Sequence, residues 1–242
     1  MTDHAVSAII LAAGLGERMG AAGNKMLLTL AGEPLLLHAV RPFACHPEIS
    51  EVVIVVRPDE EGAVEAVLEP LGRSVRLVPG GATRRDSALH GVRSAVGSHV
   101  VIHDGARPFT RDALITRVLD ATLRHGAAIP VLPSADTLHV KNERNRLVRT
   151  LDRASIVRAQ TPQGFLRSVI LDALEHATRD ITDDAAAVLA SGNPVHCVAG
   201  HPYNLKITHP EDIALARGIA RALAAEGDAH ARHPVARPRR SG

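Results

Sequence analysis

Short apolar, β-rich runs alternate along this chain with amphipathic stretches long enough to form helices. The predicted strands are Val6–Ala12, Val52–Val56, Val75–Val78, Val100–His103, Ala127–Leu132 and Val195–Ala199. The predicted helices are Glu33–Cys45, Asp59–Leu71, Arg84–Val96, Arg111–Arg124, Leu166–Thr178, Asp183–Ala190 and Pro210–Ala225. The first run is apolar on both faces, which is typical of a parallel strand covered by helices. This alternation predicts βαβ units with right-handed crossovers. We therefore expect an α/β fold with a Rossmann-like, mostly parallel sheet flanked by helices.

One segment interrupts the alternation. Between Pro133 and Arg158 the sequence becomes polar and alternating, as in the run Thr-Leu-His-Val-Lys that begins at Thr137. We expect residues 133–158 to form an extended arm or hairpin inserted into the sheet, and not another βα unit.

The C-terminal residues differ from the rest in charge. Residues 227–242 are rich in Pro, Arg and His, and they hold four of the 28 basic residues but only one of the 26 acidic ones. Without them, 24 basic residues face 25 acidic ones, so the basic character belongs to this end. Such a segment has too little apolar surface to fold. We expect one domain over residues 1–226 and a disordered basic tail over 227–242.

Composition excludes several classes of protein. Aromatic residues make up 2% of the 242 residues and Trp is absent, which argues against a stacking platform for nucleic acid. Cys45 and Cys197 are too few for a disulfide framework or a zinc site, and their apolar neighbours predict buried thiols. Residues 1–5 lack a signal-peptide pattern, and no apolar run reaches membrane-spanning length. We expect a soluble cytoplasmic protein that binds neither nucleic acid nor membrane.

Ligands of open α/β sheets bind at the carboxyl ends of the strands. The loop after the first strand contains Ala12, Ala13 and Gly14, followed by two cations, Arg18 and Lys25. Glycine-rich turns let backbone N–H groups approach phosphate oxygens. The glycine spacing departs from the dinucleotide fingerprint, and no Walker A motif is present. Two cations in such a loop favour a triphosphate, although a plain strand–turn–helix would also carry solvated basic residues.

Two further loops have similar chemistry. Gly80 and Gly81 precede a helix that carries Ser87 in its first turn, an arrangement suited to reading a base edge or simply to a tight turn. Asp104 and Gly105 end a buried strand, and this carboxylate is well placed to hold Mg²⁺ against phosphates. The neighbouring Arg107 would bind a phosphate, or would pair with Asp104 at a helix cap. Two other features have structural interpretations: His103 as a strand-end packing residue, and Asp183-Asp184 as a helix cap.

Together these motifs resemble a known family. The run Ala-Ile-Ile-Leu-Ala-Ala-Gly-x-Gly-x-Arg-Met-Gly, with a lysine seven residues after its arginine, resembles the opening of sugar-nucleotide pyrophosphorylases. Six further motifs resemble more specifically the 2-C-methyl-D-erythritol 4-phosphate cytidylyltransferase family, which serves the non-mevalonate route to isoprenoids. These motifs are His103-Asp104-Gly-Ala-Arg107-Pro108, Gly80-Gly-x-x-Arg84-x-x-Ser87, Asp152-Arg153, Thr161-Pro-Gln163, Ile181-Thr182-Asp183 and Asn204-Leu-Lys206-Ile-Thr. The resemblance extends over about residues 5–222.

The resemblance implies a role for each matching residue. CTP would meet the three loops, at Ala12, Ala13, Gly14, Gly80, Gly81, Ser87, Asp104 and Gly105. Arg18 and Lys25 match the transition-state stabilisers, and Asp104 matches the acid near Mg²⁺. A sugar-alcohol phosphate would meet Arg107, Thr137, Arg153, Thr161, Thr182 and Lys206, of which Arg153 and Lys206 position its phosphate. The arm would clasp a second subunit in a homodimer, in which Arg153 could serve the partner's site.

The match has departures, and other functions stay open. Asn24 replaces the proline that often precedes the lysine, and Ala82 and Thr83 replace an acidic residue, which leaves the placement of the lysine and the ribose contacts less secure. A ribitol-5-phosphate cytidylyltransferase would share most of these motifs, and a non-catalytic nucleotide-binding regulator would share the glycine loops. A dinucleotide-dependent oxidoreductase is disfavoured by the glycine spacing.

Overall fold

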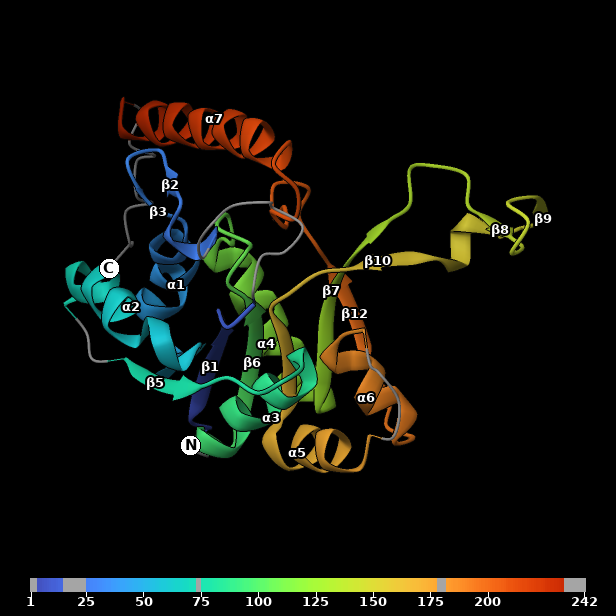
Figure 1. Ribbon diagram of the computed structural model, residues 1–242, viewed down its shortest axis with the longest axis horizontal. Helices are drawn as coiled ribbons and strands as arrows, with labels where there is room; N and C mark the ends of the chain where they lie inside the picture. The colour runs from blue at the N-terminus through green and yellow to red at the C-terminus, as the bar shows by residue number, and fades with distance from the viewer. Residues whose placement is uncertain (1–3, 15–24, 73–74, 178–181, 233–242) are drawn as a thin grey trace, which may run out of the picture.

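The computed structural model describes residues 4–14, 25–72, 75–177 and 182–232, except for the side chains of Lys25 and of 226–232. Its main element is an eight-stranded sheet with the order β10-β7-β11-β6-β1-β4-β5, in which β12 pairs with β7 (Figure 1). The strands are β1 (Val6–Leu11), β4 (Glu51–Val56), β5 (Arg76–Pro79), β6 (His99–Asp104), β7 (Ala127–Pro133), β10 (Val157–Ala159), β11 (Gln163–Leu166) and β12 (His196–Ala199).

Most of the sheet is parallel, as predicted. β5, β4, β1 and β6 run in one direction, and β12 runs parallel to β7. The short strands β10 and β11 run antiparallel to their neighbours, and the sequence analysis did not identify them. Strand β11 lies between β6 and β7, so the two halves of the sheet are joined through an antiparallel strand.

Helices cover both faces of the sheet and bury two apolar clusters. They are α1 (Leu35–Cys45), α2 (Glu61–Leu68), α3 (Arg84–Ser94), α4 (Asp112–His125), α5 (Arg167–His176), α6 (Asp184–Ala190) and α7 (Asp212–Arg232). Alternate residues of β1 explain the two layers. Ile10 packs with residues of α1, α2 and α4, whereas Ile9 packs with residues of α3, α5 and α6. The predicted Rossmann-like α/β fold is confirmed.

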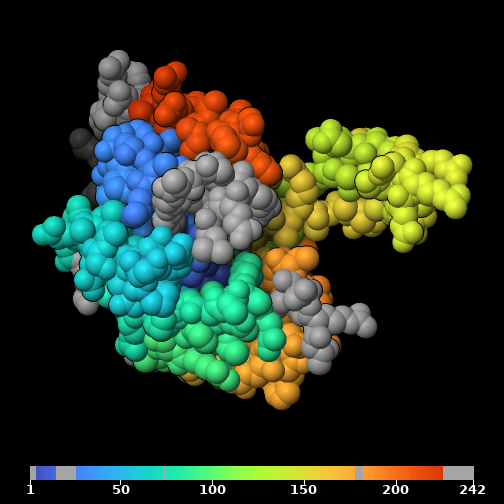
Figure 2. Space-filling view, in the orientation of Figure 1, coloured from blue at the N-terminus to red at the C-terminus, as the bar shows by residue number. Residues whose placement is uncertain are grey.

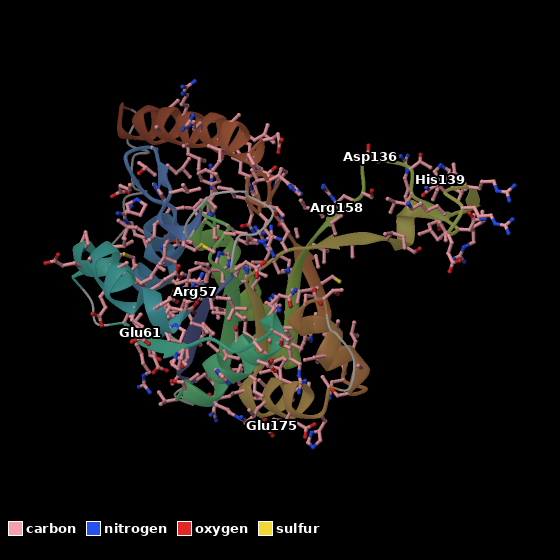
Figure 3. All side chains as sticks on the ribbon, viewed as in Figure 1. Arg57, Glu61, Asp136, His139, Arg158 and Glu175 are labelled. Atoms are coloured by element: carbon pink, nitrogen blue, oxygen red, sulfur yellow. The ribbon has the colours of Figure 1, made fainter. Side chains whose placement is uncertain are left out.

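The interruption in the pattern is an arm (Figures 1 and 2). It leaves the sheet at the end of β7, returns at β10, and carries a hairpin made of β8 (His139–Lys141) and β9 (Leu147–Thr150). The side chains along it point largely into solvent, with Arg158 near its base and His139 farther out (Figure 3). Leu147 and Val148 are neighbours in β9, and their side chains are 67% and 57% exposed.

Two expectations differ from the structure. Cys45 and Cys197 are exposed and not buried. Cys45 is the last residue of α1, and Cys197 lies in β12, which pairs only with β7 among the described strands. The C-terminal helix α7 continues to Arg232, past the expected helix end at Ala225, and residues 233–242 of the expected tail lie outside the described residues. No helix in the described part of the chain combines the length and apolar character needed to span a bilayer.

Candidate active site

The loops that follow β1, β5 and β6 meet at one edge of the sheet. The register pairs Leu11 with Asp104, so the first glycine loop lies beside the end of β6. The Gly105 N–H donates to the Leu11 carbonyl at 3.0 Å, and the Gly80 N–H donates to the Val56 carbonyl at 2.7 Å. A Cβ on Gly80 would lie 2.5 Å from the Cβ of Ala13, so only glycine allows this close approach. The three predicted loops therefore form one site.

The second loop is closed onto the helix that follows it. The Gly81 N–H donates to the Ser87 hydroxyl oxygen at 3.1 Å. Helix α3 begins with a capping box, in which the Thr83 hydroxyl accepts from the Asp86 N–H and the Asp86 carboxylate accepts from the Thr83 N–H. The loop is thus held rigidly, with Ser87 as its anchor.

The Asp104 carboxylate is surrounded by cations. Lys206 Nζ lies 2.7 Å from its Oδ2, and Arg84 Nη2 lies 3.4 Å from its Oδ1. Arg107 Nε lies 3.9 Å from Oδ2 and is a buried N–H that has no hydrogen-bond partner among the described residues. Burial alone would raise the pKa of Asp104, but these three cations outweigh it and hold the pKa well below its ordinary value. Asp104 is therefore a permanent negative charge in a positively charged pocket.

Arg84 is held by a second carboxylate. Asp184, at the start of α6, accepts two hydrogen bonds from the Arg84 guanidinium, at 3.0 and 2.8 Å, and is fully buried. The bidentate pair connects α3 to α6 across the pocket. The predicted helix cap is confirmed for Asp183, whose side chain accepts from the Ala186 N–H. The burial of Asp184 was not predicted, because a pair of aspartates at a helix start is usually explained by capping.

A buried polar network lies behind the pocket. The imidazole of His103 is fully buried and packs on Phe43, with 4.7 Å between ring centroids. Its Nδ1 lies 3.0 Å from the Thr161 hydroxyl, and its Nε2 lies 3.1 Å from the Arg107 carbonyl. Burial lowers the pKa of His103 to about 4, so the ring is neutral at pH 7. The packing predicted for this residue is present, together with hydrogen bonds at both nitrogens.

The pocket between these groups has a volume of about 200 Å³. It is lined by Arg84, Asp104, Arg107, Ala159, Gln160, Thr161, Gln163, Thr182, Asp183 and Lys206. Charged and polar groups predominate, which suits a charged, hydroxylated ligand.

The sequence also matches a family model. Residues 6–222 match the model described as IspD: 2-C-methyl-D-erythritol 4-phosphate cytidylyltransferase. The chain belongs to this family.

Individual relatives agree with the IspD assignment. A protein named 2-C-methyl-D-erythritol 4-phosphate cytidylyltransferase from Geobacillus thermodenitrificans (strain NG80-2) is 38% identical over 225 residues, which is 90% of this chain and 98% of the relative. The crystal structure of the protein of that name from Thermus thermophilus is 35% identical, with a TM-score of 0.74 over 88% of this chain and 98% of the other.

A longer relative is similar as well. The protein named bifunctional enzyme IspD/IspF from Anaeromyxobacter sp. (strain Fw109-5) is 42% identical over 245 residues, which is 98% of this chain. This chain spans 63% of the length of that relative.

The structure of this IspD family member brings together most of the predicted site residues. Asp104, Arg107, Thr161, Thr182 and Lys206 line the pocket. The backbone of the three glycine loops lies at the same edge of the sheet, and contributes Ala12, Ala13, Gly14, Gly80, Gly81, Ser87 and Gly105.

Other predicted residues lie elsewhere. Thr137 and Arg153 are exposed on the arm and do not line the pocket of their own chain. Arg18 and the Lys25 side chain lie outside the described residues. Arg84 and Gln163 were missed as pocket residues, although both occur within motifs that carried the resemblance. Arg84 could have been predicted as a pocket residue from its position, because it is a basic residue in the first helical turn after a glycine pair.

Proposed function

We propose that this chain transfers the cytidylyl group of CTP to 2-C-methyl-D-erythritol 4-phosphate in the cytoplasm. The products are 4-diphosphocytidyl-2-C-methyl-D-erythritol and pyrophosphate, in the synthesis of isoprenoid precursors. The observation that carries the proposal is the Asp104 carboxylate among Lys206, Arg84 and Arg107, beside the first glycine loop. Family membership supports the same reaction.

The chemistry requires charge neutralisation more than acid–base catalysis. An oxygen of the acceptor phosphate attacks the α-phosphorus of CTP in line, and the bond from that phosphorus to the bridging oxygen of pyrophosphate breaks. A phosphate monoester is already ionised near pH 7, so no general base is needed. The difficulty is that one anion must approach another, and positioned cations reduce the repulsion.

The nucleotide would bind along the glycine loops. The Ala12 N–H donates to the Val55 carbonyl at 2.8 Å, so the N–H groups of Ala13 and Gly14 would contact its phosphates. Gly80, Gly81 and Ser87 would contact its base and ribose. Arg18 and Lys25 would stabilise the charge that develops on the leaving pyrophosphate.

The acceptor would bind in the pocket. Lys206 would hold its phosphate, while Arg107, Thr161 and Thr182 would contact its oxygens. Lys206 is the most accessible of the three cations around Asp104, with 37% of its side chain exposed. It is therefore the cation best placed to exchange its carboxylate partner for a phosphate.

The arm would complete the site of a second subunit. Thr137 and Arg153 are absent from the pocket of their own chain, and exposed Leu147 and Val148 on the arm would be covered in a homodimer. We infer that Arg153 reaches the acceptor phosphate in the partner's pocket.

The residues present fit a magnesium ion that enters with the nucleotide. Within the described ranges no group of three or more His, Cys, Asp or Glu side chains could hold a metal alone. A single carboxylate at a phosphate pocket suits Mg²⁺, which is commonly held by one or two carboxylates and by substrate phosphates. Asp104 would be that ligand, and the ion would neutralise phosphate charge.

Pyrophosphate release tests the proposal. The purified chain is incubated with CTP and Mg²⁺, with either 2-C-methyl-D-erythritol 4-phosphate or ribitol 5-phosphate as acceptor. We expect release with the first acceptor and not with the second. Release with ribitol 5-phosphate alone would overturn the acceptor assignment. CTP binding without release from either acceptor would favour a non-catalytic nucleotide-binding protein.

A further inference from the structure

We propose that His103 is a positioning residue that fixes the turn from Asp104 to Arg107, and thereby the two charged side chains that this turn presents to the pocket. The inference deepens the proposed function and rests on it for the meaning of the pocket. It concerns a residue that does not line the pocket and so would not touch a substrate there.

The first contact acts on Asp104. The Thr161 hydroxyl oxygen accepts the Asp104 backbone N–H at 3.1 Å and lies 3.0 Å from His103 Nδ1. Without the imidazole, the Thr161 side chain would lose a partner that holds its rotamer. Because Thr161 lies on the segment that leads into β11, the antiparallel neighbour of β6, this contact ties the end of β6 to the adjacent segment of the pocket lining.

The second contact acts on Arg107. His103 Nε2 lies 3.1 Å from the Arg107 carbonyl, which can only accept, so this nitrogen carries a proton and donates. The Arg107 N–H in turn donates to the Asp104 carbonyl at 3.0 Å. Both ends of the turn are therefore held by the same ring.

The burial of the ring indicates that its hydrogen bonds, and not its packing alone, require a histidine here. His103 is fully buried beside Phe43, in a strand whose preceding positions are the apolar Val101 and Ile102. A polar side chain in such a place is destabilising unless it is hydrogen-bonded. Packing alone would be satisfied by an apolar residue, whereas hydrogen bonds to the Thr161 hydroxyl and to the Arg107 carbonyl require a side chain with a polar atom at each position.

Three substitutions at His103 and one at Thr161 separate positioning from packing. His103→Phe retains the ring packing and removes both nitrogens. His103→Asn places an amide near the position of Nδ1, and His103→Gln places one near Nε2. Thr161→Val removes the intermediate hydroxyl, alone and in the His103→Phe background. His46→Phe is the matched control, because His46 is also buried, has a hydrogen bond to Thr116 at 3.0 Å and lies outside the pocket.

The kinetic measurements are kcat and KM for CTP and for the acceptor, on folded full-length protein. We expect His103→Phe to lower kcat about 100-fold, as misplacement of reacting groups by about 1 Å does, with KM for CTP changed less than about threefold. His103→Asn should be at least about tenfold more active than His103→Phe. Thr161→Val should cost less in the His103→Phe background than in the unsubstituted chain, because the contribution that the two residues share is already lost and only the contact of Thr161 to the acceptor remains. His46→Phe should leave kcat unchanged.

A second measurement does not depend on activity. Hydrogen–deuterium exchange of the Asp104 amide should be at least about tenfold faster in His103→Phe and in Thr161→Val than in the unsubstituted chain or in His46→Phe. The inference is wrong if Asp104 exchange is unchanged in both variants, or if His103→Phe is the most active of the three His103 variants. If the unsubstituted chain releases no pyrophosphate, the proposed function fails, and the exchange rates by themselves decide the role of His103.

Discussion

At the scale of single residues, the negative charge of Asp104 in the pocket is compensated by the cations that surround it. Lys206 and Arg84 take one carboxylate oxygen each, and Arg84 is itself fixed by Asp184. A nucleotide–metal complex that engages Asp104 would compete for these contacts and would release Lys206 toward an incoming phosphate. In the proposed mechanism the cations would thus pair with the carboxylate in the free protein and with the phosphates in the complex.

Lys25→Ala should lower turnover far more than CTP affinity. A cation that acts on the leaving pyrophosphate is needed most in the transition state, and removal of one such stabiliser costs about 3–4 kcal/mol, or a factor of about 10² to 10³. The measurements are kcat and the Kd for CTP. The control is Arg93→Ala, which removes an exposed cation on α3 that pairs with Glu175. A rise in Kd as large as the loss in kcat/KM would indicate uniform ground-state binding instead.

His103 should make the free energy of unfolding depend on pH. Burial lowers its pKa from 6.5 to about 4, so between these values the unfolded chain binds a proton that the folded chain does not. The stabilisation is complete above pH 6.5 and is lost as the pH falls toward 4, by up to about 3 kcal/mol. Urea unfolding at pH 7.5 and pH 5 measures it. The difference in the free energy of unfolding between the two pH values should be larger in the unsubstituted chain than in His103→Asn. An equal difference in both proteins would contradict a neutral, buried His103.

At the scale of elements, hydrophobic patterning located most of the fold but not the antiparallel part. The predicted strands and helices that repeat an apolar pattern are all present, with ends shifted by a few residues. Strands β10 and β11 were missed because they are short and because β11 begins with the polar, buried Gln163. Their position is set by pairing with β6 and β7, which is long-range information that a local pattern does not contain.

The same limit applies to the site. Glycine loops and the carboxylate at the end of β6 were predictable because each is a local motif. The Arg84–Asp184 pair joins residues a hundred positions apart, and only the packing of α3 on α5 and of α5 on α6 brings them together. The exposure of Cys45 and Cys197 was likewise mispredicted, because local apolar neighbours do not reveal a helix end or an edge strand.

Gly164→Ala in β11 should destabilise the protein by about 1–3 kcal/mol, the usual range for overpacking. A Cβ at this position would collide with the Thr122 side chain, which is held in place by its hydrogen bond to the Val118 carbonyl. Gly62→Ala is the matched control, since it lies in α2 with no atom within 4 Å of the added Cβ. It should stabilise by about 0.5–1 kcal/mol. Urea unfolding of both variants tests the pair, and equal effects would contradict the packing assigned to β11.

At the scale of the whole molecule, contacts within a single chain do not explain the position of the arm. It projects from the body (Figure 2). It carries exposed apolar side chains, and the two residues on it that are predicted to bind the acceptor, Thr137 and Arg153, do not line the pocket of their own chain. A symmetric dimer would place each arm against the other subunit. The site would then be shared between chains.

Mixing two inactive variants tests this shared site. Arg153→Ala and Lys206→Ala should each have little activity. In a mixed dimer, one pocket would combine an intact Lys206 with the intact Arg153 of the other subunit. When equal amounts are mixed and subunits exchange, half of the dimers contain one chain of each variant, and each of these has one complete site out of two. About a quarter of the activity of the unsubstituted dimer should therefore return. No recovery after verified subunit exchange would mean that Arg153 serves its own chain.

The measurement that tests the mechanism most directly is the stereochemical course at the α-phosphorus. The chain is given a single diastereomer of cytidine 5′-O-(1-thiotriphosphate) with 2-C-methyl-D-erythritol 4-phosphate and Mg²⁺, and the configuration of the product is determined by ³¹P NMR. Direct in-line attack by the acceptor phosphate predicts inversion. Retention would reveal a covalent enzyme intermediate and would contradict catalysis by positioning and charge alone.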